Sequence, residues 1–260
     1  MKSSFDATFN QDNFDSKFKK TAMETKIIKG EIIKDKIFYE VKQETARIEA
    51  TYKTAPGIAF VGFSCTPLAK YNIPLHFQTA QAMGFRVFTE ILPNHASEPE
   101  VFAVIDNLNT REDVHAIVLL QPLPDQLNPV RIVSRIDPLK EVEGFHPVNM
   151  MSTMIPDLQT GRYPMCLPEA LFEMFSEAEV KPAKDQEWVF ILDDSFFSNT
   201  LTKMIVRAAA SRVVPNDAPV TFINKECEKL AEHCRRADFL VVVTKFPEYI
   251  QAEWLKEGVC

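Results

Sequence analysis

The sequence predicts an α/β protein of two consecutive domains, and three observations lead to that prediction. First, short apolar runs alternate with helical patterns between residues 57 and 136, as in strands joined by crossover helices. Second, the alternation stops in a turn-rich linker at 156–164 and begins again at Trp188. Third, 260 residues are enough for two modest domains with separate cores. Because such alternation produces right-handed crossovers, we expect a parallel sheet in each domain.

The first domain is expected to open with a long helix that carries Ile33, Ile37, Val41 and Ile48 on one face. A later helix has Ser97 as its N-cap and acidic residues in its first turn. The expected elements are a helix at 27–51, strands at 57–63, 86–92 and 114–120, and helices at 68–83, 97–108 and 129–136.

The second domain repeats the alternation and is predicted to be Rossmann-like. Its first helix has Pro168 in the first turn, a position that proline favours. The expected elements are helices at 167–178, 198–210, 226–236 and 250–256, and strands at 189–192, 220–223 and 239–243. We place the boundaries at 1–25 for a polar N-terminal extension, 26–150 for the first domain and 151–260 for the second.

The composition is that of an ordinary globular protein, with 46% hydrophobic and 25% charged residues. No apolar run approaches the roughly 18 residues that a membrane span requires. The net charge of -7 argues against a broad nucleic-acid-binding surface, because such surfaces neutralise phosphates, but leaves a local contact open. Residues 1–25 have no apolar core, so we expect no secretory signal there, and they contain no arginine, so we expect that any mitochondrial presequence is absent or already removed.

The five cysteines are odd in number, scattered and without a C-x-x-C pair, which indicates reduced thiols in an intracellular compartment. Cys227, His233 and Cys234 have the residue types of a metal site, but they share one short helical stretch and lack a fourth ligand. We therefore favour a structural role for these residues over a metal site, and expect no metal.

A pocket is expected where the third strand of the first domain ends. The apolar run 114–120 leads into Gln121-Pro122-Leu123-Pro124, and the two prolines require the chain to leave the sheet. A second cluster of turn and polar residues follows at 137–149. Ligands of open α/β sheets bind beyond the carboxyl ends of the strands, which is where these residues are expected.

The most distinctive motif is Glu-Val-Glu-Gly-Phe-His-Pro-Val-Asn at 141–149. It is accompanied by Lys-Ile-Ile-x-Gly (26–30), Leu-Asn (108–109), Pro-Leu-Pro (122–124), Ala-Asp (237–238) and Trp-Leu-Lys-Glu-Gly (254–258). Together these motifs resemble the methylenetetrahydrofolate dehydrogenase/cyclohydrolase family of one-carbon metabolism over residues 26–260. The resemblance implies a folate-type N-terminal α/β domain, a Rossmann-like domain for a nicotinamide dinucleotide, and a cleft between them.

The resemblance also implies where catalytic groups would stand. The family uses a Tyr and a Lys four residues apart, the Lys assisting proton transfer at the folate nitrogens, and a Gln that orients the Lys. Here those positions are occupied by Asn72, His76 and Leu120, with Tyr71 and Gln121 one residue away. A one-residue shift turns a helical side chain by about 100° and moves a strand side chain to the other face. We therefore expect no catalytic residue, with His76 as the one candidate base if the protein is active.

A remnant of the folate pocket is expected at Gln121, Pro122, Leu123 and Glu143. Glu143 stands where the family has an aspartate that holds the folate. The replacement keeps the carboxylate but lengthens the side chain by one methylene, which we expect to misplace a bidentate contact.

The phosphate loop that the resemblance implies is altered. Glycines let a backbone approach phosphates, but the sequence has no glycine between Gly161 and Gly258. The corresponding run includes Leu192, Asp193, Asp194, Ser198 and Thr200. The two aspartates would place negative charge beside a pyrophosphate, which is repulsive.

Other cofactor positions also differ from the family. They are occupied by Asn224-Lys225-Glu226-Cys227 and Lys245-Phe246-Pro247, and the family's Cys-Thr-Pro by Cys166-Leu167-Pro168. The family continues beyond the position of Cys260, so we expect a second domain truncated at its C-terminal end. No cofactor is expected, and NAD or NADP only if the protein is an active enzyme.

The extension 1–25 carries Phe5, Phe9, Phe14 and Phe18 in two pairs at helical spacing. Four aromatic side chains on a polar segment suggest docking, either on the body of the protein or on other protein subunits.

Two functional hypotheses remain open. The favoured one is a catalytically inactive relative of the family, a pseudoenzyme that serves as a structural or interaction subunit of a larger assembly. A mitochondrial assembly is slightly favoured over a cytoplasmic one. The alternative is a divergent folate-dependent dehydrogenase/cyclohydrolase in which His76 and Glu143 have altered roles.

Overall fold

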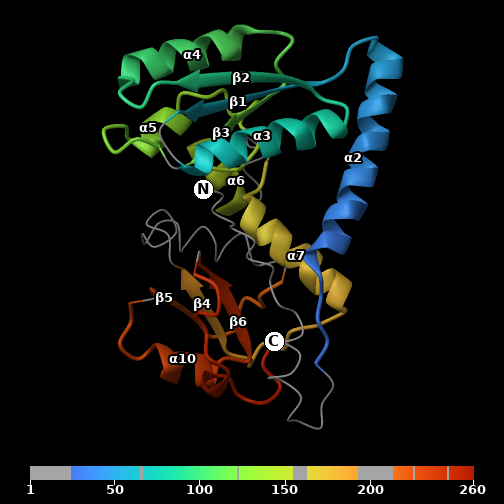
Figure 1. The fold of residues 1–260 in the computed structure, drawn as a ribbon. Helices are drawn as coiled ribbons and strands as arrows, with labels where there is room; N and C mark the ends of the chain where they lie inside the picture. Colours follow the sequence, from blue (N-terminus) through green and yellow to red (C-terminus); the bar gives the residue numbers. More distant parts are fainter. Residues whose placement is uncertain are drawn as a thin grey trace, which may run out of the picture. The chain divides into compact units, whose positions relative to one another are not determined.

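A parallel sheet forms the centre of the N-terminal unit in the computed structural model (Figure 1). It consists of β1 (Gly57–Phe63), β2 (Arg86–Leu92) and β3 (Ala116–Leu119), in the order β2-β1-β3. All pairings are parallel, with Gly57 opposite Arg86 and Ile58 opposite Ala116. The helices of this unit are α2 (Gly30–Tyr52), α3 (Pro67–Ala82), α4 (Glu98–Thr110), α5 (Pro129–Val133), α6 (Pro147–Met154) and α7 (Cys166–Ala178).

The structure describes residues 25–64, 67–121, 123–154, 163–192, 213–224, 226–244 and 246–260. The described residues between 29 and 179 form one unit and those between 180 and 260 belong to the other. Several predictions fall outside the described residues: the four phenylalanines of the extension, Pro122, the helix expected at 198–210, and Asp193, Asp194, Ser198 and Thr200 of the expected phosphate loop.

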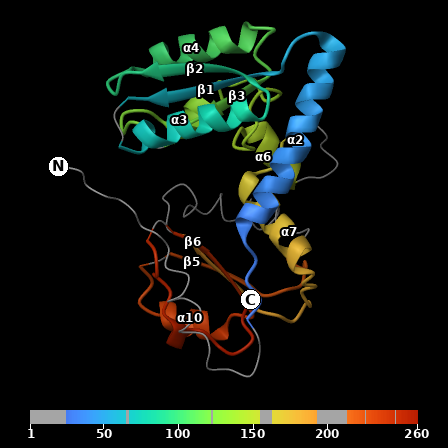
Figure 2. The same cartoon turned by 45° about the vertical axis from the view of Figure 1, so that its right-hand side comes forward.

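Helices cover both faces of the N-terminal sheet, α4 on one and α3 on the other (Figures 1 and 2). Alternate residues of β1 serve the two faces: Ala59 and Val61 pack with Ile105 of α4, whereas Phe60 packs with Ala80 of α3. Strands buried on both faces have the continuous apolar sequence seen here. The carboxyl ends of the strands are thereby fixed at one edge of a rigid layer.

The C-terminal unit has a second parallel sheet, β5-β4-β6. Its strands are β4 (Trp188–Leu192), β5 (Val220–Asn224) and β6 (Phe239–Val243), accompanied by α10 (Leu230–Arg236) and the 3₁₀ turn η3 (Ala252–Trp254). All five residues of β4 are buried, and the Trp188 ring stacks on Phe239 with centroids 4.2 Å apart. The prediction of two α/β domains with parallel sheets is confirmed.

The structure differs from the sequence-based expectations at a few elements. Helix α6 was not expected, although Pro147 at its first position is a common helix start. The helix expected at 226–236 begins only at Leu230, and a single 3₁₀ turn replaces the helix expected at 250–256. In the described part of the chain, every helix is too short or too polar to cross a membrane.

Candidate functional site

The candidate site lies at the carboxyl end of β3. The segment after Lys140 runs parallel to β3, since the Ile117 amide donates to the Lys140 carbonyl at 2.7 Å and Glu141 forms a bridge with Ile117. The pairing places Glu143 beside Leu119, the last residue of β3. The Leu119 backbone amide donates to the Glu143 carboxylate. Glu143 therefore lies where an open α/β sheet binds its ligands.

Glu141 organises the turn that presents Glu143. Its side chain is only 2% exposed, and its carboxylate accepts hydrogen bonds from three N–H groups. The donors are the backbone amides of Glu143 (2.8 Å) and His146 (3.0 Å) and the side-chain amide of Asn149 (3.0 Å). A buried carboxylate with this many donors has its charge compensated, so Glu141 acts as the internal anchor of the motif.

Glu143 has an unusual acidity for a carboxyl group. Burial, followed by the neighbouring Glu141, raises its pKa to about 7, against the opposing effect of the hydrogen bond from the Leu119 amide. Desolvation and a like charge both disfavour the ionised form. A carboxyl group that changes protonation near neutral pH is suited to proton exchange with a ligand.

The turn at Glu143 is held against the start of α7. Gly144 has a φ of +78°, and a Cβ at this position would lie 2.5 Å from the Pro164 carbonyl and 2.6 Å from the Met165 amide nitrogen. The Cys166 thiol donates to the Glu143 carbonyl at 3.8 Å, and burial followed by Glu143 raises the pKa of that thiol. Only glycine permits this approach of two backbones.

His76 and Leu120, which the resemblance aligns with the family's Lys and Gln, lie on the α3 face of the sheet. The His76 ring is tilted against Phe60, with centroids 5.7 Å apart, and its side chain is exposed. Leu120 packs in the apolar cluster that contains Phe60 and Val118. A side chain at Gly62 would meet Cδ1 of Leu120 at 3.4 Å. His76 thus has an aromatic neighbour, and the apolar Leu120 cannot orient it by a hydrogen bond as a glutamine would. The Asn72 side chain lies outside the described residues.

The other predicted pocket residues are only partly brought together. Leu123 packs against the main core cluster, whereas Gln121 is exposed directly after β3. Sequence reasoning identified Glu143 but missed Glu141 and Cys166. The signal for Glu141 was the spacing of two acids in Glu-Val-Glu; no sequence signal indicated that Cys166, 23 residues later, touches Glu143.

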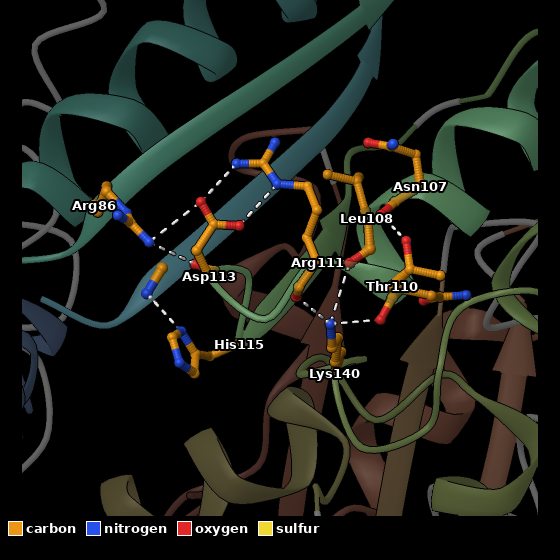
Figure 3. A network of polar contacts seen from close by, with 10 residues as sticks. Arg86, Asn107, Leu108, Thr110, Arg111, Asp113, His115 and Lys140 are labelled. Atoms are coloured by element: carbon orange, nitrogen blue, oxygen red, sulfur yellow. Dashed lines mark hydrogen bonds and ion pairs between the residues drawn. The ribbon is translucent and has the colours of Figure 1, made fainter. Parts of the chain in front are cut away.

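A polar network at the opposite, amino edge of the sheet has a structural role (Figure 3). Arg111 pairs with Asp113 through two hydrogen bonds of 2.8 and 2.9 Å, and Arg86 approaches Asp113 at 3.3 Å. Both guanidinium groups lie over the Phe88 ring, at 5.2 and 4.1 Å from its centroid. These cations are already paired, and ligands of parallel sheets bind at the other edge.

The expectation for Cys227, His233 and Cys234 can be compared with the structure. Cys234 is buried in the core of the C-terminal unit, whereas the His233 ring contacts the Arg236 guanidinium at 3.0 Å. Within the described ranges, no three His, Cys, Asp or Glu residues are placed to hold a metal ion.

At the carboxyl edge of the second sheet, the described polar groups serve local turns. The Asn224 side chain accepts from the Glu226 amide at 3.0 Å, and the Thr244 hydroxyl from the Phe246 amide at 3.2 Å. Lys225 and Lys245 lie outside the described residues.

Comparison of the sequence with protein families gives two adjacent matches. Residues 28–143 match the model "Tetrahydrofolate dehydrogenase/cyclohydrolase, catalytic domain", and residues 165–260 match "Tetrahydrofolate dehydrogenase/cyclohydrolase, NAD(P)-binding domain". The two matches correspond to the two sheets, although helix α7 belongs to the N-terminal unit in the structure.

Curated relatives and solved structures agree with these matches. The chain is 31% identical to the bifunctional protein FolD of Desulfosudis oleivorans over 92% of this chain and 77% of the relative. It is 32% identical to that of Desulfotalea psychrophila over 91% and 78%. The fold is similar to that of the Trypanosoma brucei methylenetetrahydrofolate dehydrogenase-cyclohydrolase, crystallised with NADP and an inhibitor (TM-score 0.76, 24% identity, 90% and 76% covered). The FolD structure from Campylobacter jejuni is also similar (TM-score 0.74, 22% identity, 88% and 77% covered).

Proposed function

The chain belongs to the tetrahydrofolate dehydrogenase/cyclohydrolase family, and from that premise we propose that it is a folate-dependent enzyme of this type with an altered site. We propose further that it acts through the cyclohydrolase half of the chemistry. That half hydrolyses a methenyl bridge with water and needs no hydride acceptor. The relatives named above are bifunctional enzymes, which favours activity over the inactive reading.

The observation that carries this proposal is the position of Glu143. Glu143 stands where the resemblance implies an aspartate that holds the folate, and the turn that carries it, at the end of β3, is anchored by Glu141. Folate ring systems present N–H donors, for which a buried carboxylate is a strong partner. The extra methylene of Glu143 relative to the family's aspartate changes the reach of the contact but not its chemistry.

His76 is the candidate base in this proposal. It occupies the position of the family's lysine on α3, on the face of the sheet that carries Phe60. A ring nitrogen of a neutral imidazole can accept the proton that an attacking water loses. The Lys–Gln arrangement of the family is absent because Leu120 is apolar, so we expect slower catalysis than in the family's usual members.

The sequence of the expected phosphate loop argues against a nicotinamide dinucleotide, because it lacks glycine and carries two aspartates. The family domain that matches residues 165–260 is named for NAD(P) binding, which supports dinucleotide binding if the protein is an active dehydrogenase. However, the sequence places Asp193 and Asp194 in the expected phosphate loop. We therefore derive no step of the reaction from a bound dinucleotide.

The test is hydrolysis of methenyltetrahydrofolate by the purified full-length chain, followed by loss of the methenyl absorbance. We expect turnover above the uncatalysed rate, at least tenfold lower in His76→Ala and retained in the control His233→Ala, whose ring lies on α10. Folate binding without turnover, or equal rates in His76→Ala, would reject the proposed catalytic role.

A non-catalytic subunit remains a second candidate, favoured by Leu120 and by the two aspartates of the phosphate loop. In that case the extension with Phe5, Phe9, Phe14 and Phe18 is a candidate docking segment for other protein subunits, in a mitochondrial or cytoplasmic assembly. Deletion of residues 1–25 should then release the protein from its co-purifying partner without lowering its melting temperature. Unchanged co-purification would reject the docking role.

A further inference from the structure

We infer that Asn149 is a positioning residue of the candidate site: it holds Glu141, fixes through it the turn that carries Glu143, and thereby sets the affinity of the site for its ligand. The inference rests on the proposed function, because it takes a folate as the ligand. It assigns a role to a side chain of α6 that the proposed function leaves unused.

Asn149 is buried and donates to oxygens of the preceding turn. It is the third residue of α6 and is only 1% exposed. Its side-chain Nδ2 lies 3.0 Å from the Glu141 carboxylate, 3.1 Å from the Glu141 carbonyl and 3.2 Å from the Pro138 carbonyl. An amide group has two hydrogens, so these three acceptors share them. One side chain of α6 therefore holds both the backbone and the side chain of Glu141.

The Glu141 carboxylate passes this constraint to Glu143. Its Oε1 atom accepts the Glu143 amide at 2.8 Å. Its Oε2 atom accepts the His146 amide and the Asn149 side chain, each at 3.0 Å. A carboxylate that is held at one oxygen by two donors presents its other oxygen in one orientation. Asn149 is thus connected to the backbone of Glu143 by two hydrogen bonds through one carboxylate.

The other end of this segment is held independently of Asn149. The Lys140 carbonyl accepts from β3 at 2.7 Å, and the Lys140 ammonium group donates to carbonyls at the end of α4. These contacts lie at the amino edge of the sheet, whereas Glu143 lies at the carboxyl edge. There the Cys166 thiol contact is long, at 3.8 Å. Loss of Asn149 should therefore loosen the turn at Glu143 and leave the sheet in place.

A loosened turn should weaken binding more than turnover. A turn that can take several positions must be ordered when the ligand binds, and this ordering lowers the affinity. The candidate base His76 lies on α3, beside Phe60, and is held by a different element. For Asn149→Ala we expect the Kd of tetrahydrofolate and the KM of methenyltetrahydrofolate to rise about tenfold, and kcat to change less than about twofold.

Calorimetric titration with tetrahydrofolate and hydrolysis of methenyltetrahydrofolate, both on the full-length protein, measure these constants. Each variant is assayed at a temperature at which it is folded. Asn149→Ala removes all three side-chain bonds, whereas Asn149→Ser keeps one shorter donor and should have intermediate constants. Val101→Ala is the control, because Val101 is buried on α4 and its truncation leaves a cavity that lowers the melting temperature. Its Kd and KM should equal those of the unsubstituted protein.

A merely structural Asn149 would behave as the control does. A lower melting temperature of Asn149→Ala with unchanged Kd and KM overturns the inference and leaves the proposed function intact, as does a loss of kcat at unchanged KM. If Asn149→Ala does not fold, the same comparison is made with Asn149→Ser.

The unsubstituted protein separates the inference from the proposed function. If it binds tetrahydrofolate without hydrolysing the methenyl compound, only the proposed catalytic role is rejected, and the Kd values of the variants support or overturn the role of Asn149. Failure of the unsubstituted protein to bind tetrahydrofolate overturns the proposed function together with the inference.

Discussion

The backbone amide of Glu143 donates to the carboxylate of Glu141 at 2.8 Å, so two acids of one short motif, Glu141 buried and Glu143 partly buried, lie together at the end of β3. One acid is fully engaged by N–H donors, and the other has its carboxyl group beside that charge. Such asymmetric pairs separate an anchoring role from a titrating role.

The pH dependence of stability should reveal Glu143. Its folded pKa of about 7 lies above the unfolded value of 4.5, so the folded state binds more protons between these pH values. The stability that the protonated group contributes is therefore complete below about pH 4.5 and is lost as the pH rises through 7. We expect a loss of about 3 kcal/mol across this window, measured by urea unfolding at a series of pH values.

The matched variants make this measurement specific. Glu143→Gln should flatten the dependence between about pH 5 and 7, whereas Glu177→Gln on the same unit should follow the unsubstituted protein. Parallel curves for Glu143→Gln and the unsubstituted protein would show that Glu143 ionises normally.

Gly144→Ala should be strongly destabilising. The residue has a φ of +78°, and an added Cβ would lie 2.5 Å from the backbone of Pro164. Left-handed backbone and overpacking together should cost about 3 kcal/mol or more of unfolding free energy. Gly30→Ala is the matched control, because nothing lies within 4 Å of its added Cβ and it begins α2. Thermal unfolding of both variants measures the contrast, and equal melting temperatures would contradict the proposed backbone contact.

The sequence predicted the sheet cores well because burial on both faces leaves continuous apolar runs, as in β1 and β4. It overestimated β3, since Val114 and His115 belong to the preceding turn, where the His115 ring accepts from the Gly57 amide at 2.9 Å. It missed α6, whose eight residues are too few for a clear period.

The candidate site was predictable only in part. The motif at 141–149 identified Glu143, because the resemblance aligns this position with a functional position of the family. The acidity of Glu143 depends on burial and on the fold that brings α7 to the same turn. Neither property has a local sequence signal, so the titrating role required the structure.

Lys140 should stabilise the N-terminal unit through the end of α4. Its ammonium group donates to the carbonyls of Leu108 (3.2 Å), Asn109 (2.7 Å) and Arg111 (2.8 Å). Figure 3 shows Lys140 with Leu108 and Arg111. These carbonyls lie at the negative end of the helix, which a cation complements.

Replacing Lys140 with Met keeps the aliphatic stem and removes the donors, so we expect a loss of about 2 kcal/mol in urea unfolding. Lys36→Met, at an exposed position of α2, should change the free energy of unfolding by less than about 0.5 kcal/mol. A similar effect of both substitutions would mean that the helix end does not need Lys140.

Dinucleotide binding should be weak or absent despite the family of the C-terminal domain. Nucleotide phosphates require backbone N–H groups at a glycine turn and a positive potential, whereas this sequence has Asp193 and Asp194 in that loop. Two negative charges within about 5 Å of a phosphate each oppose binding by roughly 1 to 3 kcal/mol at the dielectric of a protein surface. We therefore expect no thermal shift with NAD or NADP at millimolar concentration, and a small shift with tetrahydrofolate.

Replacing both aspartates with Asn removes the repulsion without restoring the glycines, so any gain in affinity would measure the charge effect alone. A clear shift of the unsubstituted protein with either dinucleotide would show that lysines such as Lys225 or Lys245 compensate for the aspartates, and would restore the dehydrogenase half of the family's chemistry as the better proposal.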